Sequence, residues 1–409
     1  MPKLLEINTT LNSGSTGRIA EQIAIIAQND GWECYIAHGA RYVNASSVKT
    51  IQIGNIVDNY IHAFLGEYLG MHGWGSKLST LLFLRKVDKI KPDVIHLHNI
   101  HGYYLNIEYL FNYISKKNIP VVWTLHDCWS FTGHCTHFEL YGCEKWKTEC
   151  NHCQLLMAQY KSRLFDCTSK NFRKKKLLYS KVHDMTVVPV SNWLGALVKQ
   201  SILKNCKIHV IKNGIDLNVF KPTSNDIRKR FGISENKTIV LGVVASGFGK
   251  EKGREEFKAL SNYNNLAIIL VGLSVADCTG FPSSVICVGR TNNQVELAQF
   301  YTAADVFLNP TYNDTFPTTN IESLACGTPV VTYKSGGSPE IIDENTGFVV
   351  DKGDVQGLLR SIDEIIKRGK SYYKVTCRER AVKYFNKDER LSEYIHVYES
   401  IINERSNIK

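Results

Sequence analysis

The most informative stretch of the chain reads Asn309-Pro310-Thr311-Tyr312-Asn313-Asp314-Thr315-Phe316-Pro317-Thr318-Thr319-Asn320-Ile321-Glu322. Its two carboxylates, Asp314 and Glu322, stand eight residues apart. Pro317 disfavours helix at Phe316 and suits a first helical position, which predicts a helix start between the two acids. Asp314 then lies on a loop, and Glu322 lies about one turn inside the helix. Because helix starts bind anions, this stretch can hold a polyol and a diphosphate side by side.

Apolar runs alternate with helical patterns along the chain, and the alternation restarts after Asn213-Gly214-Ile215-Asp216. Buried strands separated by helices are typical of a parallel sheet covered by helices, so the predicted fold class is α/β. The expected strands are residues 4–7, 34–37, 94–97, 121–125 and 187–190, and then 239–244, 267–271, 284–287, 306–308 and 329–332. The expected helices are residues 19–28, 78–89, 107–116, 255–260, 293–303, 318–325 and 355–367.

The length of 409 residues favours two domains over a single core. We expect an N-terminal domain at residues 1–205 and a C-terminal domain at residues 206–386. Ligands bind outside the carboxyl ends of strands in open α/β sheets, so two such units in tandem predict a cleft between them. The last segment, residues 387–409, contains an amphipathic helix with Tyr394 and Tyr398 on one face, and we expect it to pack back on the N-terminal domain.

Composition and charge are those of an ordinary globular protein with an anionic partner. Hydrophobic residues make up 44% of the chain and charged residues 22%, and the net charge is +10. The first residues lack the pattern of a signal peptide, and no apolar run predicts a membrane span, so a cytoplasmic protein is expected. Twelve cysteines in that compartment are expected to be thiols or metal ligands.

Two strand ends in the first domain carry residues suited to a sugar or a phosphate. Gly14-x-x-Gly17 follows the first strand, and its glycines permit positive φ and close approach of a ligand to the backbone; a plain turn is the alternative. His126-Asp127 follows the strand at residues 121–125. A neutral histidine there can contact a sugar hydroxyl, although a satisfied core histidine gives the same pattern.

A third strand end carries His96, His98, Asn99 and His101. Alternation along the strand puts His96 and His98 on one side. Zinc is conceivable, but no third ligand is evident, and we expect hydrogen-bonding residues that line the cleft.

A cysteine-rich insertion at residues 128–153 has the spacing Cys135-x7-Cys143-x6-Cys150-x2-Cys153. Four thiols within nineteen residues suit a tetrahedral structural zinc site, and the Cys-x2-Cys end has knuckle spacing. Buried free thiols are the alternative, as are disulfides in an oxidising compartment.

Residues 161–181 are strongly basic and contain a single acid, Asp166. Apolar residues are interleaved with the charges: Leu164, Phe165, Phe172, Leu177, Leu178 and Tyr179. A basic amphipathic stretch can lie on an anionic membrane surface, and a solvated helix face is the simpler alternative.

Two further loops in the second domain follow predicted strands. Gly247-Phe248-Gly249-Lys250-Glu251-Lys252-Gly253 offers lysines at the mouth of a strand, where a cation can neutralise a diphosphate leaving group. Lys252 is the first candidate and Lys250 the second, although surface lysines are common. Ser335-Gly336-Gly337-Ser338-Pro339-Glu340 is expected to shape the loop that faces Asp314.

Taken together, these residues resemble the family-4, retaining GT-B glycosyltransferases. The motifs that carry the resemblance occur in the family's order over almost the whole chain. They are Gly14 and Gly17, His126-Asp127, Val190-Ser191-Asn192-Trp193-Leu194, Asn213-Gly214-Ile215-Asp216, Lys252-Gly253, and Asp314 to Glu322 with Ala325-Cys326-Gly327-Thr328-Pro329. The cysteine-rich insertion resembles a subset that acts in bacterial capsule, O-antigen or exopolysaccharide assembly.

The resemblance implies two Rossmann-like domains, with a UDP- or GDP-sugar donor held mainly by the C-terminal one. Glu322 matches the acid that binds the ribose diol, and Asp314 matches the acid that contacts the transferred sugar. Lys252 matches the phosphate-binding lysine, and His126 matches a histidine near the anomeric carbon. The family assigns a supporting role to the backbone at positions 315 to 317, here Thr315, Phe316 and Pro317.

The chain departs from the family pattern in two places. The first acid is usually Glu, and Asp314 is one methylene shorter. An arginine usually precedes the lysine by a few residues, but Ala245-Ser246-Gly247-Phe248-Gly249 contains none. Lys250 or Arg290 is therefore expected to substitute for it.

The implied activity is that of a hexosyltransferase-like enzyme that moves a sugar to a glycan or lipid-linked acceptor and retains the anomeric configuration. Cations and helix N-termini would stabilise the leaving group, so no catalytic metal is expected. A nucleotide-sugar and an acceptor are the expected partners, and no nucleic acid is expected. Such an enzyme would be cytoplasmic, at the inner face of the membrane. Two alternatives stay open: a nucleotide-sugar epimerase on the same fold, and a zinc-containing protein whose basic surface binds nucleic acid.

Overall fold

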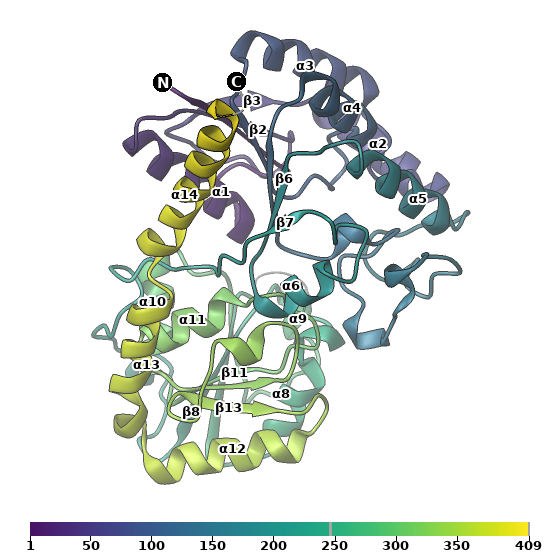
Figure 1. Ribbon diagram of the computed structural model, residues 1–409. Helices are drawn as coiled ribbons and strands as arrows, with labels where there is room; N and C mark the ends of the chain where they lie inside the picture. Colours follow the sequence, from purple (N-terminus) through teal and green to yellow (C-terminus); the bar gives the residue numbers. More distant parts are fainter. Residues whose placement is uncertain (245–247, 408–409) are drawn as a thin grey trace. The chain divides into compact units, whose positions relative to one another are not determined.

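The structure is a computed structural model that describes residues 1–244 and 248–407, and its chain forms two compact units (Figure 1). Unit 1 comprises Met1–Ile211 and Leu391–Lys409, and unit 2 comprises Lys212–Arg390. Both crossings between the units lie a few residues beyond the boundaries expected from the sequence.

Unit 1 contains a seven-stranded sheet with the order β3-β2-β1-β4-β5-β6-β7, in which neighbouring strands are parallel. The strands are β1 (Lys3–Asn8), β2 (Glu33–His38), β3 (Lys49–Gln52), β4 (Val94–Leu97), β5 (Val121–Leu125), β6 (Met185–Pro189) and β7 (Lys207–Ile208). The helices are α1 (Gly14–Asn29), α2 (Ile56–Leu69), α3 (Lys77–Ile90), α4 (Ile107–Lys117), α5 (Thr168–Tyr179) and α6 (Asn192–Val198). Since β1, β4 and β5 are neighbours, the loops that follow them leave the same edge of the sheet.

Unit 2 contains a six-stranded parallel sheet with the order β10-β9-β8-β11-β12-β13. The strands are β8 (Thr238–Val243), β9 (Leu266–Val271), β10 (Ile286–Val288), β11 (Val306–Asn309), β12 (Val330–Tyr333) and β13 (Gly347–Val350). The helices are α7 (Ile227–Arg230), α8 (Arg254–Leu260), α9 (Val275–Cys278), α10 (Gln294–Ala303), α11 (Thr318–Ala325), α12 (Val355–Arg368) and α13 (Lys370–Tyr384). The last helix, α14 (Lys387–Ser406), begins in unit 2 and continues in unit 1.

The predicted α/β class and the two Rossmann-like sheets are confirmed. Every predicted strand is present, with ends shifted by a residue or two. Helix α1 begins at Gly14 rather than at residue 19, because its first turn, Gly14-Ser15-Thr16-Gly17, has no apolar periodicity to reveal it. Helices α2, α6, α7, α9 and α13 and strands β3, β7 and β13 were not predicted.

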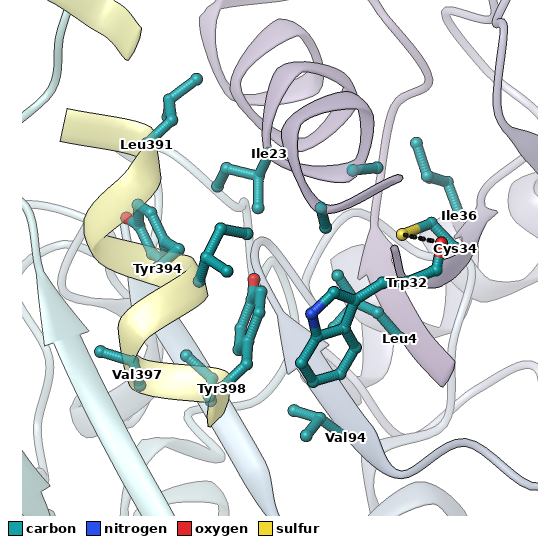
Figure 2. Packing of buried hydrophobic residues seen from close by; sticks show 14 of the residues in the cluster. Leu4, Ile23, Trp32, Cys34, Ile36, Val94, Leu391, Tyr394, Val397 and Tyr398 are labelled. Atoms are coloured by element: carbon teal, nitrogen blue, oxygen red, sulfur yellow. Dashed lines mark hydrogen bonds between the residues drawn. The ribbon is translucent and has the colours of Figure 1, made fainter. Parts of the chain in front are cut away.

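Helix α14 packs its apolar face onto unit 1 (Figure 2). Tyr394 and Tyr398 are almost fully buried, as their spacing predicted, together with Leu391 and Val397. The Tyr398 ring lies 5.5 Å from that of Trp32, between α1 and β2. Large buried aromatic rings of this kind dominate core energetics, so the end of the chain is an integral part of unit 1.

None of the helices in the part of the chain that the structure describes combines the length and the apolar composition that crossing a bilayer requires.

Candidate functional site

Three neighbouring strands of unit 2, β8, β11 and β12, carry the predicted donor-binding residues on the loops that follow them. Lys252 ends a short 3-10 helix, Lys250–Lys252, after β8, and Asp314 follows β11. The Lys252 Nζ lies 3.8 Å from the Asp314 Oδ2, and both side chains are partly exposed. The fold therefore places a cation and a carboxylate, sixty-two positions apart in sequence, at one edge of the sheet.

The lysine loop is docked tightly on the loop that carries Asp314. Gly253 has a φ of 78°, and a Cβ there would lie 2.2 Å from Pro310 Cγ, so only glycine permits this approach. The backbone N–H of Tyr312 donates to the Glu251 carbonyl at 2.8 Å. These contacts fix the position of Lys252 relative to Asp314.

The loop after β12 supports Asp314 from another side. Gly336 has a φ of 50°, and a Cβ there would lie 1.7 Å from the Asp314 carbonyl oxygen. The Gly337 N–H donates to the same oxygen at 3.4 Å. The loop at residues 335–340 thus contacts the backbone of Asp314, as the sequence predicted.

Helix α11 runs from Thr318 to Ala325, as predicted, and Pro317 occupies its N-cap rather than its first helical position. Pro317 has an extended ψ of 113°, which excludes it from the helix. The Phe316 N–H donates to the Asp314 Oδ1 at 3.2 Å, so this N–H holds the carboxylate in place. The side chains of Thr315 and Phe316 are buried and form the inside of the loop.

Glu322 lies on α11 one turn from its start, as predicted, and Tyr301 of α10 orients it. The Tyr301 hydroxyl donates to the Glu322 Oε2 at 2.9 Å. Tyr301 is fully buried, and burial together with the Glu322 carboxylate raises its pKa well above the ordinary value. The sequence did not single out Tyr301, because its position in α10 follows an ordinary core pattern.

The residues expected to replace the missing arginine, Lys250 and Arg290, are both exposed. Lys250 follows β8, whereas Arg290 follows β10. Strand β9 lies between β8 and β10, so these two strands are about 10 Å apart. Among the described residues, no side-chain hydrogen bond or ion pair joins either of them to Lys252 or Asp314. Arg254 is engaged elsewhere, since its guanidinium donates to the Asp277 carbonyl at 2.6 Å. The segment 245–247, where the arginine was sought, lies outside the described residues.

In unit 1, His126 follows β5 and connects to a buried chain of titratable groups. Its Nε2 lies 3.1 Å from the His98 Nδ1, and the His98 Nε2 lies 3.2 Å from the Glu6 Oε2. Burial raises the pKa of Glu6 and lowers the pKa of His98. Burial also lowers the pKa of His126 to about 4, so its imidazole is neutral at pH 7.

Asp127 and His101 lie within hydrogen-bond distance of each other beside this chain. The His101 Nε2 lies 2.7 Å from the Asp127 Oδ2, and its Nδ1 lies 2.6 Å from the Tyr160 hydroxyl. Although burial opposes it, His101 holds the pKa of Asp127 at about 2. His98, His101, His126 and Asp127 line a cavity of about 10 Å³, which has room for about one water molecule.

His96 does not line a cleft, contrary to the prediction. It is fully buried, and its two ring nitrogens lie 2.8 Å from the Thr124 Oγ1 and 2.6 Å from the Tyr398 hydroxyl. Glu6, His96 and His98 have ligand atoms within 4.8 Å of one another. Glu6 is therefore a third candidate metal ligand beside the two histidines, which the sequence did not reveal. Both nitrogens of His96 already have protein partners, whereas the Glu6 Oε1 is buried without a hydrogen-bond partner.

The two glycines of the loop after β1, Gly14 and Gly17, have different surroundings. Gly17 is buried, and a Cβ there would lie 2.6 Å from the Thr10 Oγ1, so it permits the close packing of α1 on its preceding loop. Gly14 is exposed with a φ of 67°, and a Cβ there would meet nothing within 4 Å. Only Gly14 leaves space for a ligand.

The four predicted zinc ligands, Cys135, Cys143, Cys150 and Cys153, all line one cavity of about 220 Å³ in unit 1. The Gly133 N–H donates to the Cys150 Sγ at 3.3 Å, and the Leu155 N–H donates to the Cys153 Sγ at 3.4 Å. Among the described residues, the ligand atoms of Glu6, His96 and His98 lie within 4.8 Å of one another, and no three cysteine sulfurs lie that close. The four sulfurs are therefore spread further apart around their cavity.

The six apolar residues of the basic stretch 161–181 divide equally between the inside of unit 1 and its surface. Phe172, Leu178 and Tyr179 are buried. Lys175 is also buried, and its Nζ donates to the Trp129 carbonyl at 2.6 Å and the Thr132 carbonyl at 3.0 Å. The exposed apolar residues of the stretch are Leu164, Phe165 and Leu177.

Two family models match successive parts of the chain. Residues 57–219 match the one described as Glycosyltransferase Family 4, and residues 225–383 match the one described as Glycosyl transferases group 1. The colanic acid biosynthesis glycosyl transferase WcaC of Escherichia coli K12 is 24% identical over 323 residues, which are 76% of this chain and 77% of that protein.

Solved structures show the same fold. Sucrose-phosphate synthase from Thermosynechococcus elongatus superposes with a TM-score of 0.74 at 18% identity, over 99% of this chain and 100% of that one. HepE from Anabaena in complex with UDP superposes with a TM-score of 0.67 at 16% identity, over 98% of this chain and 100% of that one, and it was also solved with UDP-glucose. With its two Rossmann-like units and successive family matches, the chain belongs to the family-4, group-1 glycosyltransferases of the GT-B fold.

Proposed function

We propose that the protein transfers a sugar from a nucleotide-sugar donor to a hydroxyl of a glycan or lipid-linked acceptor, in the biosynthesis of a cell-surface polysaccharide. The observation that carries the proposal is the pairing of Lys252 with Asp314 at the carboxyl edge of the unit 2 sheet, on the loop that leads into α11 and Glu322. The name of WcaC supports the polysaccharide, and the UDP and UDP-glucose complexes of HepE support the donor class.

Each residue of the unit 2 edge has a role that its chemistry suits. Glu322, oriented by Tyr301, offers two acceptor oxygens to the neighbouring hydroxyls of a ribose. Lys252 neutralises the diphosphate, and Asp314 accepts hydrogen bonds from hydroxyls of the transferred sugar. The start of α11 adds its partial positive charge to the same diphosphate.

The reaction retains the configuration at the anomeric carbon in this proposal. The bond between that carbon and the diphosphate oxygen breaks, the acceptor oxygen bonds to the carbon on the same face, and the acceptor proton leaves with the diphosphate. Lys252 and the helix start stabilise the charge that develops on the leaving group, so no catalytic metal is invoked. His126 presents a neutral imidazole that can hydrogen-bond to a sugar hydroxyl at pH 7.

Isothermal titration calorimetry with UDP-, GDP- and ADP-sugars tests donor binding. Glu322→Gln removes the charge from hydrogen bonds worth about 1.5–3 kcal/mol, so we expect the donor affinity to fall roughly ten- to a hundredfold. Glu235→Gln, at an exposed acid of unit 2, is the matched control and should leave the affinity unchanged. Failure of every nucleotide-sugar to bind would refute the proposal, and an unchanged dissociation constant for Glu322→Gln would refute its ribose contact.

The epimerase alternative is separated by supplying the donor without an acceptor. A transferase hydrolyses the donor slowly and leaves the sugar unchanged, whereas an epimerase converts it to its epimer. With an acceptor present, the NMR coupling of the anomeric proton in the product reports whether the configuration is retained.

A further inference from the structure

One buried carboxylate of unit 2 adjoins the donor-binding edge without being one of the proposed donor ligands. Glu256 is 5% exposed and lies in the first turn of α8, four positions after Lys252. Its Oε1 accepts a hydrogen bond from the Tyr312 hydroxyl at 2.5 Å and another from the Tyr333 hydroxyl at 3.2 Å. Burying a carboxylate costs free energy unless its oxygens find donors, so these contacts stabilise Glu256 where it is.

The two tyrosines come from the other two strand ends of this edge. Tyr312 lies two positions before Asp314 on the loop after β11, and Tyr333 is the last residue of β12. Their rings pack edge to face, with centroids 5.2 Å apart. One carboxylate oxygen therefore joins the carboxyl ends of β8, β11 and β12, which are neighbours in the sheet. We call Glu256, Tyr312 and Tyr333 the Glu256 cluster.

The hydrogen bonds of the Glu256 cluster lie in a buried setting. Tyr333 is fully buried and Tyr312 is partly buried. Burial and the hydrogen bond to Glu256 raise the pKa of Tyr312 to about 12, and the same causes raise the pKa of Tyr333. Both hydroxyls therefore keep their protons and remain donors to Glu256 at neutral pH.

The ion pair between Lys252 and Asp314 cannot hold these loops by itself. The two side chains are partly exposed and 3.8 Å apart, and such pairs contribute little to stability because water screens them. Tyr312 is tied to the lysine loop twice, since its N–H donates to the Glu251 carbonyl and its hydroxyl donates to Glu256. These contacts hold the Asp314 loop against the Lys252 loop.

Tyr333 anchors the third loop in the same way. The chain turns directly after it, where the Ser335 N–H donates to the Tyr333 carbonyl at 2.8 Å. Gly336 then packs against the Asp314 carbonyl oxygen, to which a Cβ would come within 1.7 Å. A shift of Tyr333 would therefore move the loop that supports the backbone of Asp314.

We propose that Glu256 is a positioning residue of the donor site, which holds the three loops so that Lys252 and Asp314 reach the diphosphate and the sugar of one donor. Since this role concerns the donor, it rests on the proposed function. Loops that are fixed before binding lose less conformational freedom when the ligand arrives, so the Glu256 cluster raises affinity through other residues. A role in packing alone would stabilise unit 2 and leave donor binding unchanged.

Hydrogen exchange of the full chain without ligand tests whether Glu256 holds the loops. Glu256→Leu removes both hydrogen bonds, so amides of residues 309–317 and 335–340 should exchange roughly tenfold faster, among them the Tyr312 N–H. Glu256→Gln keeps an acceptor oxygen and should exchange within about twofold of the unchanged protein. Unchanged exchange in Glu256→Leu would overturn the proposal.

Calorimetry with the UDP-, GDP- and ADP-sugars tests the consequence for the donor. We expect Glu256→Leu to weaken binding about tenfold and Tyr312→Phe about threefold, whereas Glu256→Gln binds nearly as the unchanged protein does. The double variant Glu256→Leu with Tyr312→Phe should bind no more weakly than Glu256→Leu alone, because their shared contact is lost only once. Free-energy losses that simply add in the double variant would refute the shared role.

The matched control is Ile268→Ala, a buried residue of β9, which lies on the other side of β8 from β11 and β12. It should lower the unfolding midpoint of unit 2 through a cavity and leave donor affinity unchanged. A loss of affinity equal to that of Glu256→Leu would show general destabilisation and exclude a positioning role.

Two outcomes separate this role from folding and from the proposed function. Circular dichroism checks that each variant is folded, and if Glu256→Leu is not, an unchanged dissociation constant in Tyr312→Phe would overturn the proposal instead. If no nucleotide-sugar binds the unchanged protein, the proposed function fails, and the exchange rates alone decide whether Glu256 holds the loops.

Discussion

Gly336 shows how a single residue without a side chain controls the donor-binding edge of unit 2. Its φ of 50° is costly for other residues, and a Cβ would lie 1.7 Å from the Asp314 carbonyl oxygen. Gly336→Ala must therefore displace the backbone of Asp314 from this position. We expect a loss of about 3 kcal/mol or more in the unfolding free energy of unit 2, and weaker donor binding, measured by denaturant unfolding and calorimetry.

Gly232→Ala separates the two causes of this effect. Gly232 has a φ of 60°, but a Cβ there would meet nothing within 4 Å, so only backbone strain of about 1 kcal/mol is expected. Donor affinity should be unchanged in this control. Equal stability losses in the two variants would show that the contact with Asp314 is unimportant.

Residue-level prediction succeeded where partners are close in sequence and failed where they are distant. The spacing of Asp314 and Glu322 around Pro317 was enough to place both acids on the loop and the helix that carry them. Tyr301 and Glu6 were missed, because each reaches its partner only through the packing of helices or strands. Nothing in the local sequence of a buried tyrosine or glutamate records such a partner.

At the scale of elements, the cysteine-rich segment has little regular secondary structure to stabilise it. Between β5 and α5 the described chain forms only three short 3-10 helices, Trp129–Phe131, Glu139–Tyr141 and Lys145–Lys147. Lys175 is buried beside the cysteines, and burial lowers its pKa to about 7, although Cys150 and Cys135 oppose this. Because a zinc ion with four thiolates carries a net negative charge, it would compensate this lysine.

We therefore expect one zinc ion per chain, held by Cys135, Cys143, Cys150 and Cys153, with the sulfurs drawn inward to about 2.3 Å from the metal. Elemental analysis of protein purified without added metal measures it. Cys150→Ser should lose the zinc and lower the melting temperature of unit 1, because metal binding is coupled to folding. Cys278→Ser, in unit 2, is the control. A protein without zinc whose four thiols all react with a thiol reagent would exclude this site.

Helix α2 was missed because its exposed side is apolar. Sequence patterns find a helix through an apolar stripe facing the core, but the buried face of α2 is Asn59, His62 and Gly66. Conversely, the basic stretch 161–181 predicted an exposed amphipathic surface, and α5 buries three of its six apolar residues, Phe172, Leu178 and Tyr179. Which side of a helix faces inward is settled by the packing around it and not by its own sequence.

At the scale of the whole molecule, the two units differ in their titratable groups. All thirteen histidines lie in unit 1, and unit 2 has none. Burial lowers the pKa of His62, His126 and His134 to about 4 and that of His72 to about 3. Folded unit 1 therefore keeps these imidazoles neutral at a pH where the unfolded chain protonates them.

Unit 1 should lose stability as the pH falls from about 6.5 to about 4, because the unfolded state then binds more protons, by about 1.4 kcal/mol per pH unit for each such histidine. The raised pKa of Glu6 has the opposite effect, because the folded state then binds a proton that the unfolded state lacks. It offsets the destabilisation from about one histidine. All six tryptophans also lie in unit 1, so tryptophan fluorescence reports its unfolding alone. A denaturation midpoint by fluorescence that stays constant from pH 6.5 to 5 would contradict this prediction.

The sequence by itself determined the α/β class, the tandem arrangement and the positions of Asp314 and Glu322, because strand length, helix periodicity and proline act locally. Only the tertiary structure decided that Lys252 meets Asp314, that His96 is internal, and that the apolar side of α2 faces outward. These outcomes depend on strand order, glycine contacts such as Gly253 on Pro310, and the packing of distant helices. No short stretch of sequence contains that information, since it arises when separate segments compete for the same space.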